Sequence, residues 1–497
     1  MTSTDTGAIR ARPQSGVDPK SMRVIWLLLV AAFVAILNET TMGIAIPHLN
    51  ADLGLAPELG QWLTSAFMLT MAVVIPTTGF LLQRFTTRQA FLAAMTAFSL
   101  GTLICLVAPG FAVLLLGRVV QAAGTGIMMP LLMTTIMNVV PPRSRGRMMG
   151  RVGLVISLAP AIGPTLSGAV LETLSWRWLF GIVLPIAVVS LLIGAKWMTN
   201  LGETKKAPID VPSIVLSAFA FGGIVYGLSQ FGGGHGGGAA DSGISPIATG
   251  AIALGVGLVV LAVFIWRQIV LQRVDDALLD LRVFRSGNFT VSVVIMSLVA
   301  LTMFGTLTLL PLYLQNVVEL DALQSGLILL PGSVLMGLLG PVTGRIYDAR
   351  GPRTLLVPGT IIVAAAIFTY STVTEHTPWW LLMAVQTAMS IGMAMSFTPL
   401  FSASLGSLER PLYSHGSAVL NTLQQVAGAA GVAILIATYS RFLHDGEQAG
   451  VAAAVAGAPG ARTAFLIAAI ISLVSVVLSF FVRKPEEAED MPAVHGH

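Results

Sequence analysis

Long apolar stretches, separated by short polar segments, fill nearly the whole chain of 497 residues. A helix needs about 20 mostly apolar residues to cross about 30 Å of hydrocarbon, and fourteen stretches meet that length. The predicted spans are 24–46, 60–82, 89–108, 111–137, 152–171, 178–195, 211–231, 246–266, 287–313, 322–344, 354–373, 378–402, 414–440 and 463–482. The pattern therefore predicts an all-α integral membrane protein that lies in the lipid bilayer.

Positive charges gather in every second connection between these spans. Of the 27 lysines and arginines, 23 fall on one face of the predicted topology. The opposite face holds Arg177, Arg441 and Arg462, and Arg118 lies within a span. Because the basic face of a membrane protein is the cytoplasmic one, we expect both termini in the cytoplasm. We place the chain in a bacterial cytoplasmic (inner) membrane, as a multi-pass protein.

The composition excludes several classes of protein. Hydrophobic residues make up 55% of the chain and charged residues only 10%, whereas a soluble domain carries about a quarter charged residues. A net charge of +4 gives no reason to expect a nucleic-acid partner. The single cysteine, Cys105, cannot form an internal disulfide, and no zinc-ligand spacing is present, so we expect no metal. Without a phosphate-binding loop or a nucleophile elbow, we expect no catalytic residues and no enzyme activity.

Two basic turns repeat at matched places in the chain. Gly79-Phe-Leu-Leu-Gln-Arg-Phe-Thr-Thr-Arg88 follows the second span, and Gly344-Arg-Ile-Tyr-Asp-Ala-Arg-Gly-Pro-Arg353 follows the tenth. If 211–266 is an insertion of two helices, each turn joins the second and third helices of a six-helix half. Two such halves suit alternating access around a central cavity. The alternative is that the turns only fix topology.

The repeat divides the chain into two six-helix halves plus two inserted helices. We predict an N-terminal tail at 1–23, a first half at 24–198, inserted helices with linkers at 199–286, a second half at 287–482 and a C-terminal tail at 483–497. Residues of the two turns are the candidates for gating: Gly79, Arg84, Arg88, Gly344, Asp348 and Arg350.

Glu39 is the carboxylate that falls deep inside a predicted span. It is the sixteenth residue of 24–46, which places it about 6 Å beyond the midplane at about 1.5 Å per residue. A charge there costs several kcal/mol unless it is paired, faces water or is protonated. A carboxyl that gains and loses a proton at this depth suits a site that exchanges a proton for a cationic or polar substrate. The alternative is a permanently neutral, hydrogen-bonded acid.

Arg118 is the basic residue of the membrane interior. It lies about a third of the way through the fourth span and keeps its proton in practice. It therefore has to face a cavity, carbonyl groups or an acid. We expect it to take part in proton coupling with Glu39; the alternative is a structural link between helices.

Other candidates are the kinked fifth span and the polar residues near the cavity. Pro160, Gly163 and Pro164 interrupt helical hydrogen bonding or permit close packing, so they suit a hinge; packing alone is the alternative. The candidates for lining a substrate cavity are polar residues of several spans: Asn38, Thr40, Tyr313, Gln315, Asn421 and Gln425.

Several stretches together resemble the major facilitator superfamily, and within it the 14-helix drug:proton antiporters of the EmrB and QacA type. Leu37 to Pro47 resembles the first-helix motif of that family, and Arg118 to Gly124 resembles its fourth-helix motif. Ala159-Pro-Ala-Ile-Gly-Pro-Thr-Leu-Ser-Gly168 resembles the fifth-helix antiporter signature, and the two basic turns resemble its loop motif. The Asn38-Glu39-Thr40 version is similar to a lincomycin-resistance-like subgroup.

The chain also departs from that pattern. Gln83 stands where the first loop of the family has an aspartate, whereas Asp348 keeps the aspartate in the second loop. Asn38 stands where many relatives have a first-helix aspartate, with Glu39 beside it.

The resemblance and Glu39 together favour proton-coupled efflux of small hydrophobic or cationic compounds by alternating access. The alternative is a facilitator or uptake carrier for a metabolite or lipid-like molecule on the same fold. We expect protons as the coupling ion, no other cofactor and a monomer in the lipid bilayer. A periplasmic adaptor is an expected partner if the source is a two-membrane bacterium.

Overall fold

The structure is a computed structural model that describes residues 18–55, 57–200, 210–231, 246–274, 276–320 and 322–485. Helices of the first half are α1 (Pro19–Leu53), α2 (Pro57–Arg84), α3 (Thr87–Leu106), α4 (Phe111–Val139), η1 (Pro142–Ser144), α5 (Arg145–Thr173) and α6 (Arg177–Trp197). The next helices are α7 (Val211–Phe231), α8 (Pro246–Leu271), η2 (Gln272–Val274) and η3 (Leu281–Arg285). Helices of the second half are α9 (Gly287–Asn316), α10 (Ala322–Arg350), α11 (Arg353–Tyr370), α12 (Trp379–Gly406), η4 (Arg410–Leu412), α13 (Tyr413–Gln448) and α14 (Ala453–Ser479).

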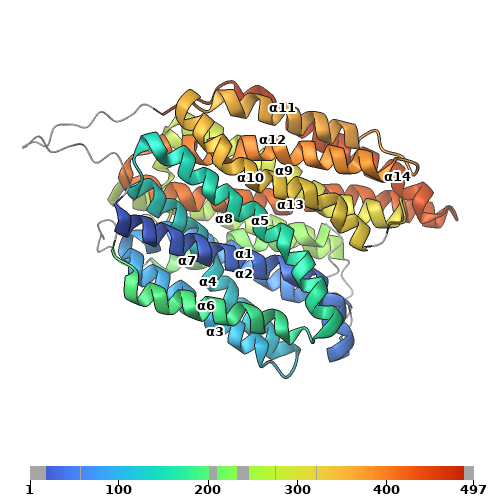
Figure 1. Cartoon of the computed structure of the whole chain (residues 1–497), viewed down its shortest axis with the longest axis horizontal. Coiled ribbons are helices and arrows are strands. Elements are labelled where there is room, and N and C mark those ends of the chain that lie inside the picture. Colours follow the sequence, from blue (N-terminus) through green and yellow to red (C-terminus); the bar gives the residue numbers. More distant parts are fainter. Residues whose placement is uncertain are drawn as a thin grey trace, which may run out of the picture.

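The prediction of an all-α membrane protein with fourteen spans is confirmed. Within the described ranges, 14 helices are long and apolar enough to cross a membrane. They run roughly along one common axis, with α1–α6 on one side of the molecule and α9–α14 on the other (Figure 1). Helices α1, α3, α4 and α6 pack on one another in the first group, and α9, α11, α12 and α14 do so in the second.

The helices α7 and α8 form a pair beside the junction of the two groups. They touch each other closely because glycines face each other across the pair: a Cβ on Gly227 would lie 2.8 Å from the Gly250 oxygen. Helix α7 packs on α2 of the first group and on α13 of the second. Asp210 and Arg267 join the start of α7 to the end of α8 through an ion pair of 2.8 Å. Burial raises the pKa of Asp210, but hydrogen bonds from Arg267 and Ser213 outweigh burial, so the pKa lies below its usual value.

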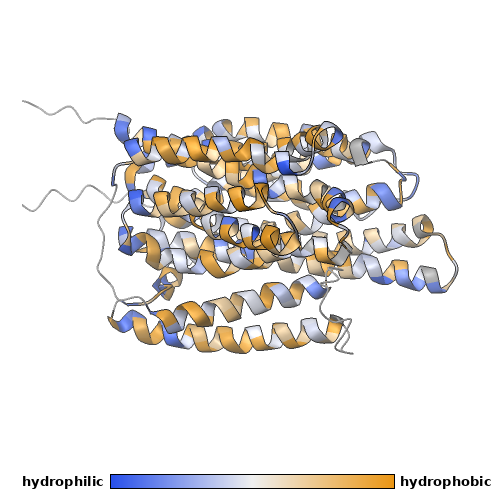
Figure 2. Ribbon diagram, turned by 90° about the horizontal axis from the view of Figure 1, so that it is seen from below, coloured by the Kyte–Doolittle hydropathy of each residue, from blue (hydrophilic) through white to orange (hydrophobic). Residues whose placement is uncertain are grey.

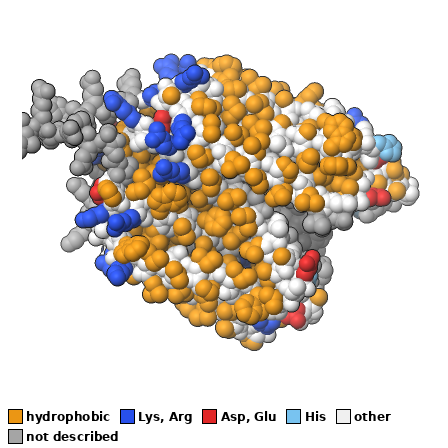
Figure 3. Space-filling view, viewed as in Figure 1, with side chains coloured by type: hydrophobic (Ala, Val, Ile, Leu, Met, Phe, Trp, Pro, Cys, Tyr) orange, Lys and Arg blue, Asp and Glu red, His pale blue; other side chains and the backbone are white. Residues whose placement is uncertain are grey.

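One end of the bundle is basic. We call the end where α1 begins and α14 ends the basic end, and the opposite one the far end. Figure 2 shows hydrophobic residues along most of the length of the helices and hydrophilic ones toward the ends. Figure 3 shows lysine and arginine side chains gathered at the basic end, next to a broad apolar surface. This charge asymmetry is the one that the sequence predicts.

Most helices extend beyond the predicted apolar spans. Helix α14 begins at Ala453, ten residues before the predicted span, because the small residues of 453–461 are helical although weakly apolar. Helix α1 ends where Gly54 adopts a left-handed backbone with φ of 62°, and α10 ends before Gly351 with φ of 80°. Glycine adopts this conformation without the steric cost that a Cβ brings, so these two residues fix the turns after α1 and α10.

Candidate functional site

Glu39 lies in the middle of α1, away from both ends of the bundle. Its side chain is partly buried, and the structure gives it no ion-pair or hydrogen-bond partner among the described residues. Arg118 of α4 is the nearby charge that acts on it electrostatically. An acid at this depth without a permanent partner costs free energy whenever it is ionised.

Arg118 is fully buried, and three groups of the first half contact it. Its Nη1 donates to Oε1 of Gln121 at 2.7 Å, and its Nε donates to the carbonyl of Leu63 at 3.4 Å. The guanidinium lies 4.1 Å from the centre of the Phe67 ring, an arrangement that stabilises a cation. Gln121 in turn donates to the hydroxyl of Thr102 at 2.7 Å.

One nitrogen of Arg118 has no such partner. Nη2 is buried without a hydrogen-bond partner in the described part of the chain. A buried, unsatisfied donor on a charged group is costly, so this nitrogen is available to an acceptor that arrives in another state. Glu39 is the carboxylate that acts on Arg118 electrostatically, although the two make no ion pair in this structure.

The polar neighbours of Glu39 on α1 have different surroundings. Asn38 is 2% exposed, and its Nδ2 has no partner among the described residues. The hydroxyl of Thr40 donates to the carbonyl of Ile36 at 3.1 Å, so this hydrogen bond stays within α1. A Cβ on Gly163 of α5 would lie 2.2 Å from that hydroxyl oxygen. Gly163 therefore lets α5 approach α1 next to the Glu39 position.

At the basic end, helices α5 and α10 touch backbone to backbone. A Cβ on Gly150 would lie 2.1 Å from the Gly340 oxygen, and one on Gly344 would lie 2.2 Å from the Gly146 oxygen. The four glycines form two Gly-x-x-x-Gly pairs, 146/150 and 340/344, which permit close approach of membrane helices. We did not predict this contact, although the spacing was visible in the sequence.

Asp348 of α10 caps the first turn of α5. Its carboxylate accepts hydrogen bonds from the backbone nitrogens of Gly146 at 2.8 Å and Arg147 at 2.9 Å. Ser144, the residue before α5, makes no side-chain cap of its own. A carboxylate at a helix N-terminus is stabilised by free N–H groups and by the helix dipole. Asp348 thus joins the two halves at the basic end.

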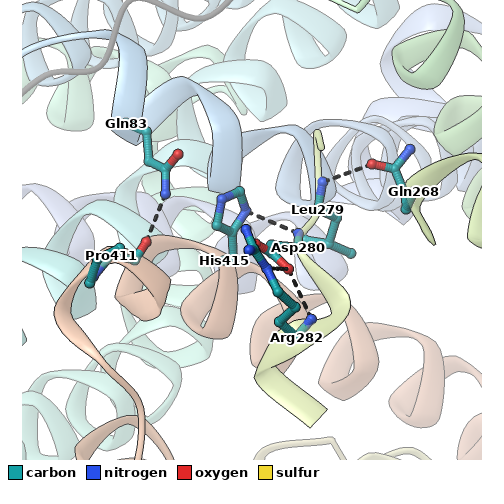
Figure 4. A network of polar contacts seen from close by, with 7 residues as sticks. All are labelled: Gln83, Gln268, Leu279, Asp280, Arg282, Pro411 and His415. Carbon is teal, nitrogen blue, oxygen red and sulfur yellow. Dashed lines mark hydrogen bonds and ion pairs between the residues drawn. The ribbon is translucent and has the colours of Figure 1, made fainter. Parts of the chain in front are cut away.

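Helices α2 and α13 meet on the other side of the same end. Nε2 of Gln83 donates to the carbonyl of Pro411 at 2.7 Å. A Cβ on Gly79 would lie 2.8 Å from Nδ1 of His415, so Gly79 makes room for that ring. Ser417 of α13 donates to the carbonyl of Pro130 in α4 at 3.4 Å. Gln83 therefore links the two halves, with its amide nitrogen as the donor and a backbone carbonyl as the acceptor (Figure 4).

A cavity of about 20 Å³ lies among α4, α5, α10 and α12, which is room for about one water molecule. Its walls include Met133, Met149, Gly153, Phe397 and Thr398. Helices of both halves therefore meet around this cavity.

The other predicted lining residues lie in varied surroundings. Tyr313 is fully buried, and its hydroxyl donates to the carbonyl of Thr374 at 2.6 Å. Gln315 is exposed near the end of α9. Asn421 donates to the carbonyl of Ser417 at 2.8 Å, and Gln425 is partly buried one turn later. Their roles at a substrate cavity stay predictions.

The remaining gating and hinge residues do not form one cluster. Arg88 donates to the carbonyl of Ala195 at 2.6 Å and so joins α3 to α6 within the first half. Arg84 is partly buried at the end of α2, and Arg350 is exposed. Pro160 is exposed within α5. Pro164 belongs to the same helix, but its side chain lies outside the described ones.

We expect Asp348→Asn to weaken closure of the basic end. The amide keeps one acceptor but loses the charge and the second acceptor, which is worth about 1–2 kcal/mol at a helix N-terminus. That loss should shift the equilibrium between states by roughly 5- to 30-fold, with turnover falling more than substrate affinity. Turnover of transport and equilibrium substrate binding, measured on the same preparation, check this.

Arg88→Ala is the matched comparison, because Arg88 binds within one half. It should change turnover less than Asp348→Asn. Equal turnover in wild type and correctly inserted Asp348→Asn protein would remove Asp348 from the gate.

A family model described as Major Facilitator Superfamily matches residues 28–432. The chain is 42% identical over 472 residues to the "Uncharacterized MFS-type transporter YcnB" of Bacillus subtilis (strain 168), covering 95% of this chain and 97% of that protein. It is 39% identical over 473 residues to the "Lincomycin resistance protein LmrB" of the same strain, covering 94% of this chain and 96% of that protein. It is 28% identical over 433 residues to the "Multidrug resistance protein B homolog" of Mycobacterium tuberculosis (strain ATCC 25618 / H37Rv), covering 85% and 78%.

Solved structures share the fold. The human organic anion transporter MFSD10 (TETRAN) superimposes with a TM-score of 0.63 at 15% identity, covering 93% of this chain and 100% of that one. The proton:xylose symporter XylE, bound to 6-bromo-6-deoxy-D-glucose, also gives 0.63, at 13% identity, with 94% and 97% covered. At such identities the likeness concerns the fold alone.

Proposed function

This chain belongs to the Major Facilitator Superfamily, and from that premise we propose that it exports small hydrophobic or cationic compounds in exchange for protons. Relatives named for lincomycin resistance and multidrug resistance support efflux as the direction of transport. The family and the fold indicate a transporter rather than an enzyme.

One observation carries the coupling proposal: a carboxyl in the middle of α1 lacks a permanent partner beside a buried arginine with a spare donor. Glu39 has no ion pair here, and Nη2 of Arg118 has no acceptor among the described groups. When Glu39 is ionised, it binds a cationic substrate or turns to Arg118. When it is protonated, it is neutral and releases both. A single group that binds either a proton or a substrate couples their movements in opposite directions.

The orientation follows from charge. We place the basic end in the cytoplasm, because basic residues gather on the cytoplasmic side of membrane proteins, and the membrane is the cytoplasmic membrane of a bacterium. The contacts of Asp348, Gln83 and Gly150 then hold the two halves together on the cytoplasmic side. Opening toward the cytoplasm requires these contacts between α5 and α10 and between α2 and α13 to separate.

The direct test is dye efflux in inverted membrane vesicles with an imposed pH gradient. Acidifying the vesicle interior should drive a lipophilic cationic dye inward, and collapse of the gradient by a protonophore should stop it. Dye movement that follows only its own gradient would indicate the facilitator, which is the competing function on this fold.

The orientation predicts which positions an impermeant thiol reagent reaches. In a Cys105→Ala background, His376→Cys and Val451→Cys lie at the far end and should be labelled in intact cells, because both residues are exposed. Arg273→Cys lies at the basic end and is exposed, so it should be labelled only after the cells are opened. The reverse pattern would invert the topology.

A further inference from the structure

Thr102 of α3 carries a fully buried hydroxyl that the proposed exchange of proton for substrate does not use. Its Oγ1 lies 2.7 Å from Nε2 of Gln121 in α4 and 2.7 Å from the carbonyl oxygen of Phe98 in its own helix. The other end of the Gln121 amide, Oε1, lies 2.7 Å from Nη1 of Arg118. A chain of three hydrogen bonds therefore joins a backbone carbonyl of α3 to the buried guanidinium.

The donor and the acceptor of each hydrogen bond in this chain follow from the groups themselves. A guanidinium only donates, so Gln121 has to present its carbonyl oxygen to Arg118. The NH2 group of the amide then faces Thr102, whose oxygen accepts. The hydrogen of the Thr102 hydroxyl is left to donate to the carbonyl of Phe98. If the amide were reversed, its NH2 group would face the donors of Arg118.

Close packing of α3 on α4 sets the distance between Thr102 and the amide. A Cβ on Gly101, the residue before Thr102, would lie 2.4 Å from the backbone nitrogen of Gln121. A Cβ on Gly124 would lie 2.4 Å from the carbonyl oxygen of Ala94. Small residues at such positions let membrane helices approach closely, so the threonine hydroxyl reaches the amide directly.

Arg118 has few other acceptors. Its Nε donates to the carbonyl of Leu63 at 3.4 Å, and its Nη2 has no acceptor among the described residues. The titratable groups that act on it are Glu39 of α1 and the thiol of Cys105 in α3. A thiol is a weak acceptor, whereas an ionised carboxylate is a strong one. If Gln121 released Nη1, Glu39 would therefore be the acceptor to which the guanidinium turns.

We propose that Thr102 is a positioning residue for proton coupling and that it acts through the Gln121 amide. The oriented amide keeps Arg118 out of an ion pair with Glu39, so the acid stays available to a proton or to a cationic substrate. This inference rests on the proposed function, because it concerns the acid that exchanges the proton.

Thr102→Val removes the hydroxyl and keeps the shape of the side chain. Nε2 of Gln121 then lacks its acceptor, the amide turns, and Arg118 reaches Glu39 and favours its ionised form. The measurement is proton release when a cationic dye is added to purified protein, followed over a range of pH. Release requires that Glu39 carry a proton before the dye binds. The pH above which release disappears should therefore fall by about one unit.

Three further variants bracket this result. Thr102→Ala removes the same acceptor and should give the same fall, whereas Thr102→Ser keeps the hydroxyl and should restore the wild-type profile. Thr125→Val is the matched control on α4. The buried hydroxyl of Thr125 donates to the backbone carbonyl of Gln121 at 3.1 Å, so its loss leaves the side-chain amide in place and the pH profile unchanged.

A double-mutant cycle tests the route from Thr102 to Arg118. Gln121→Met removes the amide but keeps an unbranched side chain of similar length, and it should lower the same pH limit. Thr102→Val should add nothing in that background, because no amide is left to orient. Such non-additivity is the mark of two residues that act through one contact.

A wild-type profile in Thr102→Val would overturn this inference and leave the proposed exchange standing. Additive shifts in the cycle would overturn it too, since Thr102 would then act by another route. Equal release from wild type and Glu39→Gln, or no release from wild type, would overturn the proposed exchange and this inference with it.

Discussion

Glu39→Gln is expected to abolish efflux driven by a pH gradient and to leave substrate binding largely in place. The amide has nearly the same size and keeps hydrogen-bonding capacity, but it cannot release a proton. Without titration at this position, the imposed gradient has no group through which to act on substrate affinity. Exchange of substrate down its own gradient should persist. Dye uptake into inverted vesicles, with and without the gradient, measures both activities.

Glu39→Asp is the matched variant for this prediction. It keeps a titratable carboxyl but withdraws it from its position by one methylene, so coupled efflux should survive in part with a displaced pH optimum. If Glu39 is instead a permanently neutral acid, the Gln variant should export almost as well as wild type. Near-normal coupled efflux in Glu39→Gln would therefore eliminate the proposed role.

Gly150→Ala is expected to reduce transport about as severely by a different route. The new Cβ would lie 2.1 Å from the Gly340 oxygen, which belongs to the backbone of α10 and cannot turn away. Overpacking costs about 1–3 kcal/mol, and this amount shifts an equilibrium by roughly 5- to 150-fold. The variant should therefore favour the state that is open at the basic end. Thr398→Cys, at the wall of the 20 Å³ cavity, should then react with a soluble maleimide in inverted vesicles.

Gly153→Ala supplies the control on the same helix. A Cβ on Gly153 would lie 3.7 Å from Oγ1 of Thr398, which is ordinary van der Waals contact. This variant should transport normally and leave position 398 protected. If Gly150→Ala also transported normally, the α5–α10 contact would not be part of the closed state of the cycle.

The sequence predicts the fold well because the bilayer imposes a length and a charge rule on every span. The apolar stretches place all fourteen helices. The predicted start of α14 is ten residues too late, because 453–461 is helical but only weakly apolar. Glu39 and Arg118 stand out for the same reason: a charge within hydrocarbon is rare and costly.

The contacts around these residues depend on how helices far apart in the chain pack. Nothing in the sequence places Phe67 next to Arg118 or Thr102 next to Gln121. The contact between Arg118 and Gln121 could have been predicted, because residues three apart lie on the same face of a helix. Asp348 was identified as a gating residue, but the partner it caps, the start of α5, lies some two hundred residues earlier.

Proton release on substrate binding is the most direct measure of the central claim, that Glu39 exchanges a proton for the substrate. Purified wild-type protein in weakly buffered detergent solution should release protons when a cationic substrate is added, and a pH indicator dye records the amount. Glu39→Gln should bind the same substrate and release none above the buffer control. Equal release from the two proteins would contradict the account, because another group would then carry the proton.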